Sequence, residues 1–142
     1  WGPIGPMAEE RRVTLQLDRS ESGSLRGDQR RLHRAVLNLL DNALRYSPDE
    51  SSIDVSVRQS GGWWLLSIRD YGPGLSEADL TRMFQRFYRG DPSRTRSNRS
   101  GSGLGLAIVQ QIAVNHGGRI EARNNPAGGA CMDLLLPREP LG

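Results

Sequence analysis

The sequence contains a single cysteine, Cys131, and no lysine, so all nineteen of its basic residues are arginines. One cysteine can form neither an intrachain disulfide nor a cysteine-based zinc site, and such scarcity is typical of a reducing, cytosolic setting. No apolar run approaches the roughly 20 residues that a transmembrane helix needs. Residues 1–10 lack the basic stretch and apolar run of a signal peptide, and we expect them to be a linker or a cloning remnant.

The charge balance excludes little by itself. A net charge of +3 and an isoelectric point near 9.7 are found in nucleic-acid-binding proteins, but also in proteins with an ordinary solvated basic surface. No stacking aromatics alternate with arginines along an expected strand, and Trp63-Trp64 is an isolated pair. We therefore expect no nucleic-acid partner. The chain has 142 residues, which is the size of one domain. A basic nucleic-acid-binding surface remains an alternative hypothesis.

Apolar residues alternate with polar ones in five short segments, which predicts five half-buried strands. Asp28 is a suitable N-cap for a long helix that ends near Ser47 and Pro48. Two further helices are expected, a short one over residues 76–84 and another over residues 104–115. Because the strands are apolar on one side only, helices should cover one face of the sheet and leave the other wet. The expected architecture is a two-layer α/β sandwich with strands near residues 13–17, 53–57, 64–68, 119–123 and 130–136.

A stripe of polar residues runs along the long helix beside its apolar face. At about 100° per residue, Asn38, Asn42, Arg45 and Tyr46 fall within roughly a third of the helix circumference. Asparagine is unfavourable inside a helix, so two of them on one face favour a site. Amide oxygens can bind Mg²⁺ beside a triphosphate, and Arg45 and Tyr46 can donate hydrogen bonds to phosphate oxygens. The alternative is an ordinary exposed polar face.

The segment Asp70-Tyr-Gly72-Pro-Gly74-Leu75 closes the third expected strand. The period of two places Asp70 on the apolar side, where an unpaired carboxylate is unfavourable. A ligand amine would satisfy this carboxylate. Adenine carries an exocyclic amine, whereas guanine presents a carbonyl that would repel the acid. The two glycines would let the backbone approach a base closely. The alternative is a tight turn that binds nothing.

A polar stretch without periodicity precedes the last helix, which opens on Gly101-Ser-Gly103-Leu-Gly105. Glycines at a helix start leave free N–H groups for phosphate, although a structural glycine loop is equally consistent. No Gly-Lys-Ser/Thr follows, so the segment is not a P-loop, and its glycine spacing is not that of a Rossmann fingerprint. Six arginines lie between the two glycine motifs, which favours a phosphate-facing role: Arg82, Arg86, Arg89, Arg94, Arg96 and Arg99.

The order of these motifs resembles the GHKL superfamily, and specifically the sensor histidine kinases. Residues 38–46 are similar to that family's N box and residues 70–75 to its G1 box. Residues 84–89 resemble the F box, with Gln85 in place of the usual glutamate, and residues 101–106 resemble the G2 box. The resemblance runs from about residue 11 to residue 137. It implies the Bergerat ATP-binding fold, with a mixed, mostly antiparallel sheet and helices on one face.

The resemblance divides the chain and assigns roles to its residues. It implies an ATP-binding catalytic domain over residues 11–137, a flexible ATP lid over about 76–103 and a C-terminal tail over 138–142. Asn42 would bind Mg²⁺ with help from Asn38, and Arg89 would act with Asn38 as a catalytic residue at the γ-phosphate. The nucleotide-binding residues that it implies are Asn38, Asn42, Arg45, Tyr46, Asp70, Gly72, Gly74, Leu75, Arg86, Arg89, Gly101, Ser102, Gly103, Leu104, Gly105 and Leu106.

One position separates this chain from the related ATPases. In gyrase, the heat-shock chaperone and the mismatch-repair proteins, a glutamate four residues before the metal-binding asparagine activates water. Asn38 stands at that position and cannot serve as a general base. We therefore expect the chain to bind Mg²⁺-ATP without appreciable hydrolysis, which favours transfer to a separate, stronger nucleophile.

Neither histidine of the chain is expected to be that nucleophile. His33 is followed by Arg34 rather than by the acidic residue of the family's H box, and it should lie near the apolar side of the helix. His116 precedes Gly117 at a helix end, and we expect both histidines to be structural. The phosphoacceptor should lie on the protein's own dimerization domain.

The resemblance also implies partners and a location. After the dimerization domain, a cognate response regulator would receive the phosphoryl group. The chain would be the cytoplasmic domain of a membrane-anchored bacterial sensor, with no direct membrane contact of its own. The alternative is a kinase of the anti-sigma-factor type, which shares the N box and phosphorylates a serine on a partner protein.

Overall fold

The computed structural model describes residues 12–20, 28–85 and 105–137, with the backbone alone for residues 16–20. Every strand and helix that the sequence predicts is present, and the short helix ends before Met83 rather than at Phe84. The strands are β1 (Thr14–Ser20), β2 (Ser52–Ser60), β3 (Trp63–Arg69), β4 (Arg119–Asn124) and β5 (Ala130–Pro137), and the helices are α2 (Gln29–Tyr46), α3 (Glu77–Arg82) and α4 (Gly105–Asn115).

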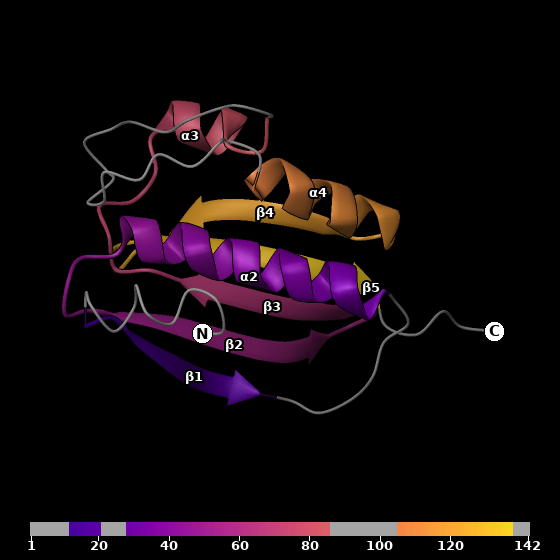
Figure 1. Cartoon of the computed structure of the whole chain (residues 1–142), viewed down its shortest axis with the longest axis horizontal. Coiled ribbons are helices and arrows are strands. Elements are labelled where there is room, and N and C mark those ends of the chain that lie inside the picture. Colours follow the sequence, from indigo (N-terminus) through magenta and orange to yellow (C-terminus); the bar gives the residue numbers. More distant parts are fainter. Residues whose placement is uncertain (1–11, 21–27, 86–104, 138–142) are drawn as a thin grey trace.

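The five strands form one sheet in the order β1-β2-β3-β5-β4 (Figure 1). β1 and β2 are parallel, and the other three neighbouring pairs are antiparallel. β3 is therefore the central strand, and β1 and β4 form the two edges. The mixed, mostly antiparallel sheet implied by the resemblance is confirmed.

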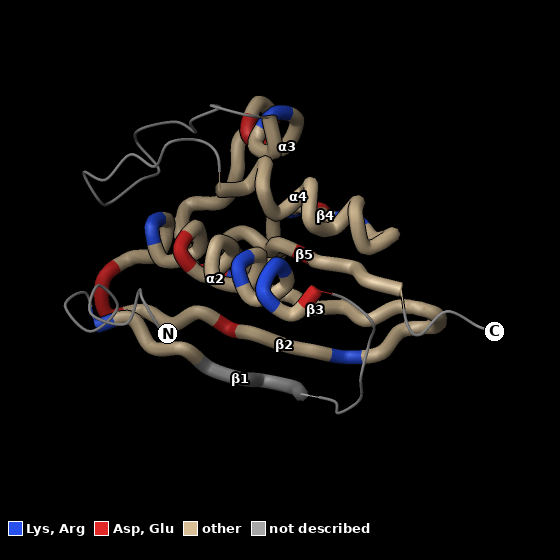
Figure 2. The backbone as a smooth tube through the Cα atoms, turned by 45° about the vertical axis from the view of Figure 1, so that its right-hand side comes forward, with Lys and Arg blue, Asp and Glu red and all other residues tan. Residues whose placement is uncertain are grey.

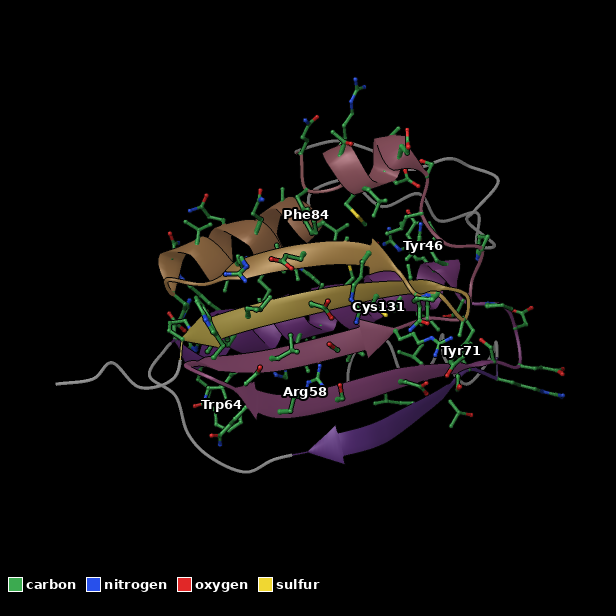
Figure 3. The ribbon with its side chains drawn as sticks, turned by 180° about the vertical axis from the view of Figure 1, so that it is seen from behind. Tyr46, Arg58, Trp64, Tyr71, Phe84 and Cys131 are labelled. Atoms are coloured by element: carbon green, nitrogen blue, oxygen red, sulfur yellow. The ribbon has the colours of Figure 1, made fainter. Side chains whose placement is uncertain are left out.

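Helices cover one face of this sheet, as the one-sided alternation predicts. Ile53 of β2, Ile68 of β3 and Leu134 of β5 are buried in one core with Leu39 of α2 and Val109 of α4. Figure 3 views the molecule from behind and shows the sheet in front of these two helices, with its other face open. The two-layer α/β sandwich is confirmed.

The signals at both ends of α2 place the helix where the sequence predicts it. The Asp28 carboxylate accepts a hydrogen bond from the Arg31 N–H (3.2 Å), as an N-cap residue does. At the other end, the Ser47 hydroxyl donates to the Ala43 carbonyl (2.7 Å). The next residue is Pro48, whose ring disfavours a helical conformation at Ser47. The polar stripe of α2 therefore ends at a fixed place above the sheet.

The two histidines differ from each other. The Asp28 N–H donates to Nε2 of His116 (2.9 Å), whose Nδ1 bonds to the Ile112 carbonyl (2.8 Å). His116 thus links the start of α2 to the end of α4, which confirms its structural role. His33 shares a side of α2 with buried Leu40, as expected, but it is exposed. It lies two turns closer to the helix start than Leu40, and burial does not extend that far.

The open face of the sheet carries polar residues of both charge signs. Ser67 donates a hydrogen bond to Asp133 (2.6 Å), and Nε of Arg123 donates to the other oxygen of the same carboxylate (2.8 Å). This bond to Asp133 raises the pKa of the Arg123 guanidinium above its ordinary value. Figure 2 shows basic and acidic residues interspersed along α2 and β2 as well. None of the described helices is long and apolar enough to cross a membrane.

Candidate nucleotide-binding site

The two predicted halves of the site, the polar stripe of α2 and the turn after β3, meet at one end of the sandwich. Figure 3 shows Tyr46, the last residue of α2, and Tyr71, in the turn, at the same end of the sheet, with Trp64 at the opposite end. A Cβ atom on Gly72 would lie only 2.2 Å from the Tyr46 carbonyl oxygen. Because only glycine permits that approach, Gly72 lets the turn lie against the end of α2.

Asp70 is the buried acid of the site. Its residue is 4% exposed and lies on the core side of the sheet, as the period of two predicts. Its Oδ1 accepts hydrogen bonds from the N–H groups of Gly72 (2.9 Å) and Ala130 (3.2 Å). Its own N–H donates to the Ala130 carbonyl (3.0 Å), so the residue extends the pairing of β3 with β5. A carboxylate offers about four lone-pair sites, so it can accept a ligand amine in addition.

The far end of the same turn is held by Asn124, the last residue of β4. Oδ1 of Asn124 accepts from the Leu75 N–H (2.6 Å), and Nδ2 of Asn124 donates to the Leu75 carbonyl (2.9 Å). Gly74 adopts φ +86°, a left-handed conformation that favours glycine. The turn is thus attached to the sheet twice, through Asp70 to β5 and through Leu75 to β4.

Gly129 and Asn124 are residues of this region that the sequence reasoning missed. Gly129 has φ +81°, and a Cβ atom on it would lie 2.0 Å from the carbonyl oxygen of Asp70. The pair Gly128-Gly129 directly before β5 could have signalled such a close approach, since glycine beside a strand often marks it. No comparable local signal identifies Asn124, because asparagine at the start of a turn is ordinary.

The polar stripe of α2 contacts the start of α4. Nδ2 of Asn38 donates a hydrogen bond to the carbonyl of Gly105 (3.3 Å), the first residue of α4. The structure therefore brings the N-box residue Asn38 to the end of the glycine-rich segment. Asn42 lies one turn further along α2 and is half-buried. In the part of the chain that the structure describes, no group hydrogen-bonds to the Asn42 side chain, whose amide can bind an external ligand.

Arg45 is paired on one side only. Its Nη2 lies 3.0 Å from Oδ2 of Asp41, and the two side chains are 27% and 29% exposed. Its Nε is buried and has no hydrogen-bond partner among the described residues. A buried donor without an acceptor is costly, so this guanidinium can still take an acceptor such as a phosphate oxygen. The sequence reasoning missed Asp41, although opposite charges four residues apart on a helix predict the pair.

The first part of the predicted lid is a capped helix that packs on the core. Ser76 Oγ accepts from the Asp79 N–H (3.0 Å), and the Asp79 carboxylate accepts from the Ser76 N–H (3.4 Å), which is the predicted helix start. Asp79 and Met83 are buried, and Leu80 and Phe84 pack against the core. Residues 76–85 are therefore anchored to the sandwich.

The rest of the predicted lid lies outside the described residues. Of the glycine-rich motif, Gly105 begins α4 and Leu106 packs against the core. The other residues with predicted roles in this segment are not described, namely Arg86, Arg89, Gly101, Ser102, Gly103 and Leu104. The nucleotide-binding roles of the described residues stay predictions as well.

Comparison with known proteins identifies the family. The model of the family described as histidine kinase-, DNA gyrase B- and HSP90-like ATPase matches residues 27–140. The sensor protein SphS of Synechococcus elongatus is 49% identical over 143 residues, which cover 96% of this chain and 35% of that protein. The sensor-like histidine kinase SenX3 of Mycobacterium tuberculosis is 38% identical over 130 residues, covering 92% of this chain and 32% of that protein. The chain thus spans about a third of the length of these two relatives.

Solved structures show the same relationship. The mycobacterial sensor histidine kinase MprB superposes with a TM-score of 0.83 at 34% identity, covering 97% of this chain and 92% of that one. Full-length ShkA in complex with AMPPNP superposes with a TM-score of 0.77 at 25% identity, covering 94% of this chain and 27% of that one. These relatives give no support to the anti-sigma-factor alternative. The chain belongs to the histidine kinase-, DNA gyrase B- and HSP90-like ATPase family, and within it to the ATP-binding catalytic domains of sensor histidine kinases.

Proposed function

We propose that this chain binds Mg²⁺-ATP where α2 meets the turn after β3 and delivers the γ-phosphoryl group to a histidine on a separate domain. One observation carries the proposal. A buried acid, Asp70, a glycine against the end of α2, Gly72, and an amide with no partner among the described residues, Asn42, converge at one end of the fold. The complex of the related ShkA with AMPPNP supports an adenine nucleotide as the ligand.

The Asp70 end of the site would bind the base. The Asp70 carboxylate is already oriented by the N–H groups of Gly72 and Ala130, so it need not reorganise to accept the exocyclic amine of adenine. A guanine carbonyl in the same place would face a buried carboxylate and be repelled. Gly72 keeps the volume beside this acid free of a side chain. This arrangement supports ATP over GTP.

The α2 stripe would bind the phosphates and the metal. The Asn42 amide oxygen is a suitable Mg²⁺ ligand, and the guanidinium of Arg45, whose buried Nε has no partner among the described residues, can donate to a phosphate oxygen, with Tyr46 beside it. When bound, Mg²⁺ neutralises charge on the phosphate oxygens. Asn38 holds the start of α4, whose N-terminal end favours anions. Gly101, Gly103 and Arg89 would complete the phosphate contacts, with Arg89 at the γ-phosphate.

Transfer rather than hydrolysis follows from position 38. The Asn38 amide cannot take a proton from water, so the nucleophile must be supplied from outside this site. In the transfer, the bond between the γ-phosphorus and the bridging oxygen of ADP breaks while a phosphorus–nitrogen bond forms to an imidazole, whose proton is released. The contribution of this chain is positioning and charge neutralisation.

The partners follow from the same proposal. We place the acceptor histidine on the dimerization domain of the full-length protein and the next acceptor, an aspartate, on a cognate response regulator. The chain would then be the cytoplasmic catalytic part of a membrane-anchored sensor. The relatives SphS, named a sensor protein, and SenX3, named a sensor-like histidine kinase, support the sensor part of this proposal.

Titration of nucleotides into this chain tests the binding site. We expect ATP to bind, Mg²⁺ to strengthen its binding, and GTP to bind at least about tenfold more weakly. Equal affinity for GTP, or no binding of ATP, would contradict the proposal.

A labelling experiment tests the reaction. With γ-labelled Mg²⁺-ATP, the chain alone should release almost no phosphate, and its dimerization domain should become labelled. Label that is stable in base and lost in acid identifies phosphohistidine, whereas the opposite behaviour identifies the serine kinase. Sustained phosphate release by the chain alone would show that a base other than residue 38 activates water.

A further inference from the structure

The turn of residues 70–75 crosses the strand ends from β3 past β5 to β4, and its last contact is made by a side chain. β4 is an edge strand whose last residue, Asn124, pairs through its backbone with Ala130. Its side chain exchanges two hydrogen bonds with the backbone of Leu75, at 2.6 Å and 2.9 Å. A side-chain amide carries one acceptor and one donor group, as a peptide unit does, so Asn124 acts on Leu75 as a neighbouring strand would.

We propose that Asn124 is a positioning residue for the bound adenine, an inference that rests on the proposed function. Asn124 touches neither the base nor the phosphates in this scheme and acts through the turn. Two features of the turn depend on it. Gly74 is held at φ +86° with a Cβ position 3.0 Å from Asn124 Oδ1, and Leu75 is held in the core at 7% exposure.

The position of Leu75 matters to the base because the segment is short. Only four residues separate Leu75 from Asp70, and Gly72 among them already lies against Tyr46 and Asp70. A turn released at Leu75 keeps Asp70 bonded to Ala130 and to the Gly72 N–H, but it loses the fixed path of Pro73 and Gly74 beside the base. Leu75 also directly precedes Ser76, the N-cap of α3, so Asn124 sets where the predicted lid begins.

Replacement of the amide gives the first test. Asn124→Ala should weaken ATP and ADP by the same factor, about tenfold, and reduce the preference for ATP over GTP, while the gain in ATP affinity on adding Mg²⁺ is unchanged. A residue that only stabilises the fold would lower the melting temperature and leave the base preference intact. Asn125→Ala is the matched control, because Asn125 is the adjacent amide and bonds to Ala127 and Cys131 rather than to the turn.

A second variant separates hydrogen bonding from volume. Asn124→Asp keeps the size and the acceptor for the Leu75 N–H, but it places a carboxylate oxygen against the Leu75 carbonyl where Nδ2 now donates. It should lose affinity as Asn124→Ala does. Wild-type affinity and base preference in either folded variant would overturn the proposal, as would a loss confined to the Mg²⁺-dependent part of binding.

Hydrogen exchange on the wild-type chain requires no variant. It tests the role of Asn124 separately from the proposed binding of ATP. The Leu75 amide should be protected without nucleotide, since its hydrogen is bonded to Asn124. An unprotected Leu75 amide overturns the role of Asn124 even if the chain binds ATP as proposed. A protected amide in a chain that binds no ATP overturns the proposed function and, with it, the role of Asn124 in binding, while leaving the contact itself established.

Discussion

The base end and the phosphate end of the site are built differently. At the base end, Oδ1 of Asp70 and both backbone groups of Leu75 already have hydrogen-bond partners in the sheet. At the phosphate end, the Asn42 amide has no partner among the described residues, and the Arg45 Nε is buried without one. The base end is therefore preorganised by the protein, whereas the phosphate end leaves hydrogen-bonding capacity for a ligand.

The difference follows from the elements that carry each end. The turn crosses three adjacent strands and is fixed at both of its ends, so it has little freedom without nucleotide. The α2 stripe lies beside the buried face of the helix, and its four residues are half-buried rather than fixed by the sheet. A change at the base end should therefore affect every adenine nucleotide alike. A change at the phosphate end should affect only the contributions of phosphate and Mg²⁺.

Replacement of the buried acid has the largest expected effect. Asp70→Asn keeps an oxygen for the Gly72 and Ala130 N–H groups, so the fold should persist, but it removes the charge that binds the adenine amine. We expect ATP, ADP and adenosine to bind about a hundredfold more weakly, equivalent to roughly 3 kcal/mol, in calorimetric titration. Asp133→Asn removes a buried carboxylate from the opposite face and should bind normally. A loss for ATP alone would place the base elsewhere.

Removal of the free amide should act on the other end. Asn42→Ala should weaken ATP about thirtyfold when Mg²⁺ is present and leave metal-free binding of ATP and binding of adenosine unchanged. Titrations at several Mg²⁺ concentrations measure the difference. Asn115→Ala, an exposed asparagine on α4, is the matched control. Equal weakening with and without the metal would mean that Asn42 contacts the nucleotide itself rather than the ion.

These two residues were predictable because their signals are local. The alternation of β3 continues to Asp70 and places it on the core side, and helical spacing places Asn42 beside Asn38. The strands and both ends of α2 were predictable for the same reason. The exposure of His33 was not, because periodicity gives the side of a helix but not how far along it the burial extends.

The contacts that hold the turn of residues 70–75 in place could not be predicted, because no local pattern in the sequence indicates them. Asn124 lies 49 residues from Leu75, and its role appears only when the turn has crossed to the edge strand. The approach of Gly72 to Tyr46 likewise joins two segments that no pattern in the sequence relates. The motif indicates that glycine is needed at position 72. The packing of α2 on the sheet determines that the Tyr46 carbonyl oxygen is the atom that excludes a side chain at that position.

The close approach of the turn to α2 gives the third prediction. In Gly72→Ala the new Cβ atom would lie 2.2 Å from a backbone oxygen that cannot move freely. We expect the free energy of unfolding to fall by about 2 kcal/mol and all adenine nucleotides to bind about tenfold more weakly. Gly62→Ala is the control, since a Cβ atom there meets nothing within 4 Å and the change should stay within about 0.5 kcal/mol. Normal affinity with lowered stability would show that the turn and the base are uncoupled.

Breaking the ion pair between Asp41 and Arg45 should change ATP affinity least, and it tests whether the base end and the phosphate end are independent. Asp41 holds one side of Arg45 at 3.0 Å and places a negative charge beside the expected phosphates. Asp41→Asn should therefore tighten ATP about two- to threefold, with a smaller gain at high salt, because the pair is partly exposed and screened. Glu121→Gln removes the same charge from the edge strand β4 and controls for net charge. Adenosine should bind both variants as it binds the wild type, since it carries no phosphate. A gain for adenosine in Asp41→Asn would mean that the two ends of the site are coupled through α2 and are not independent.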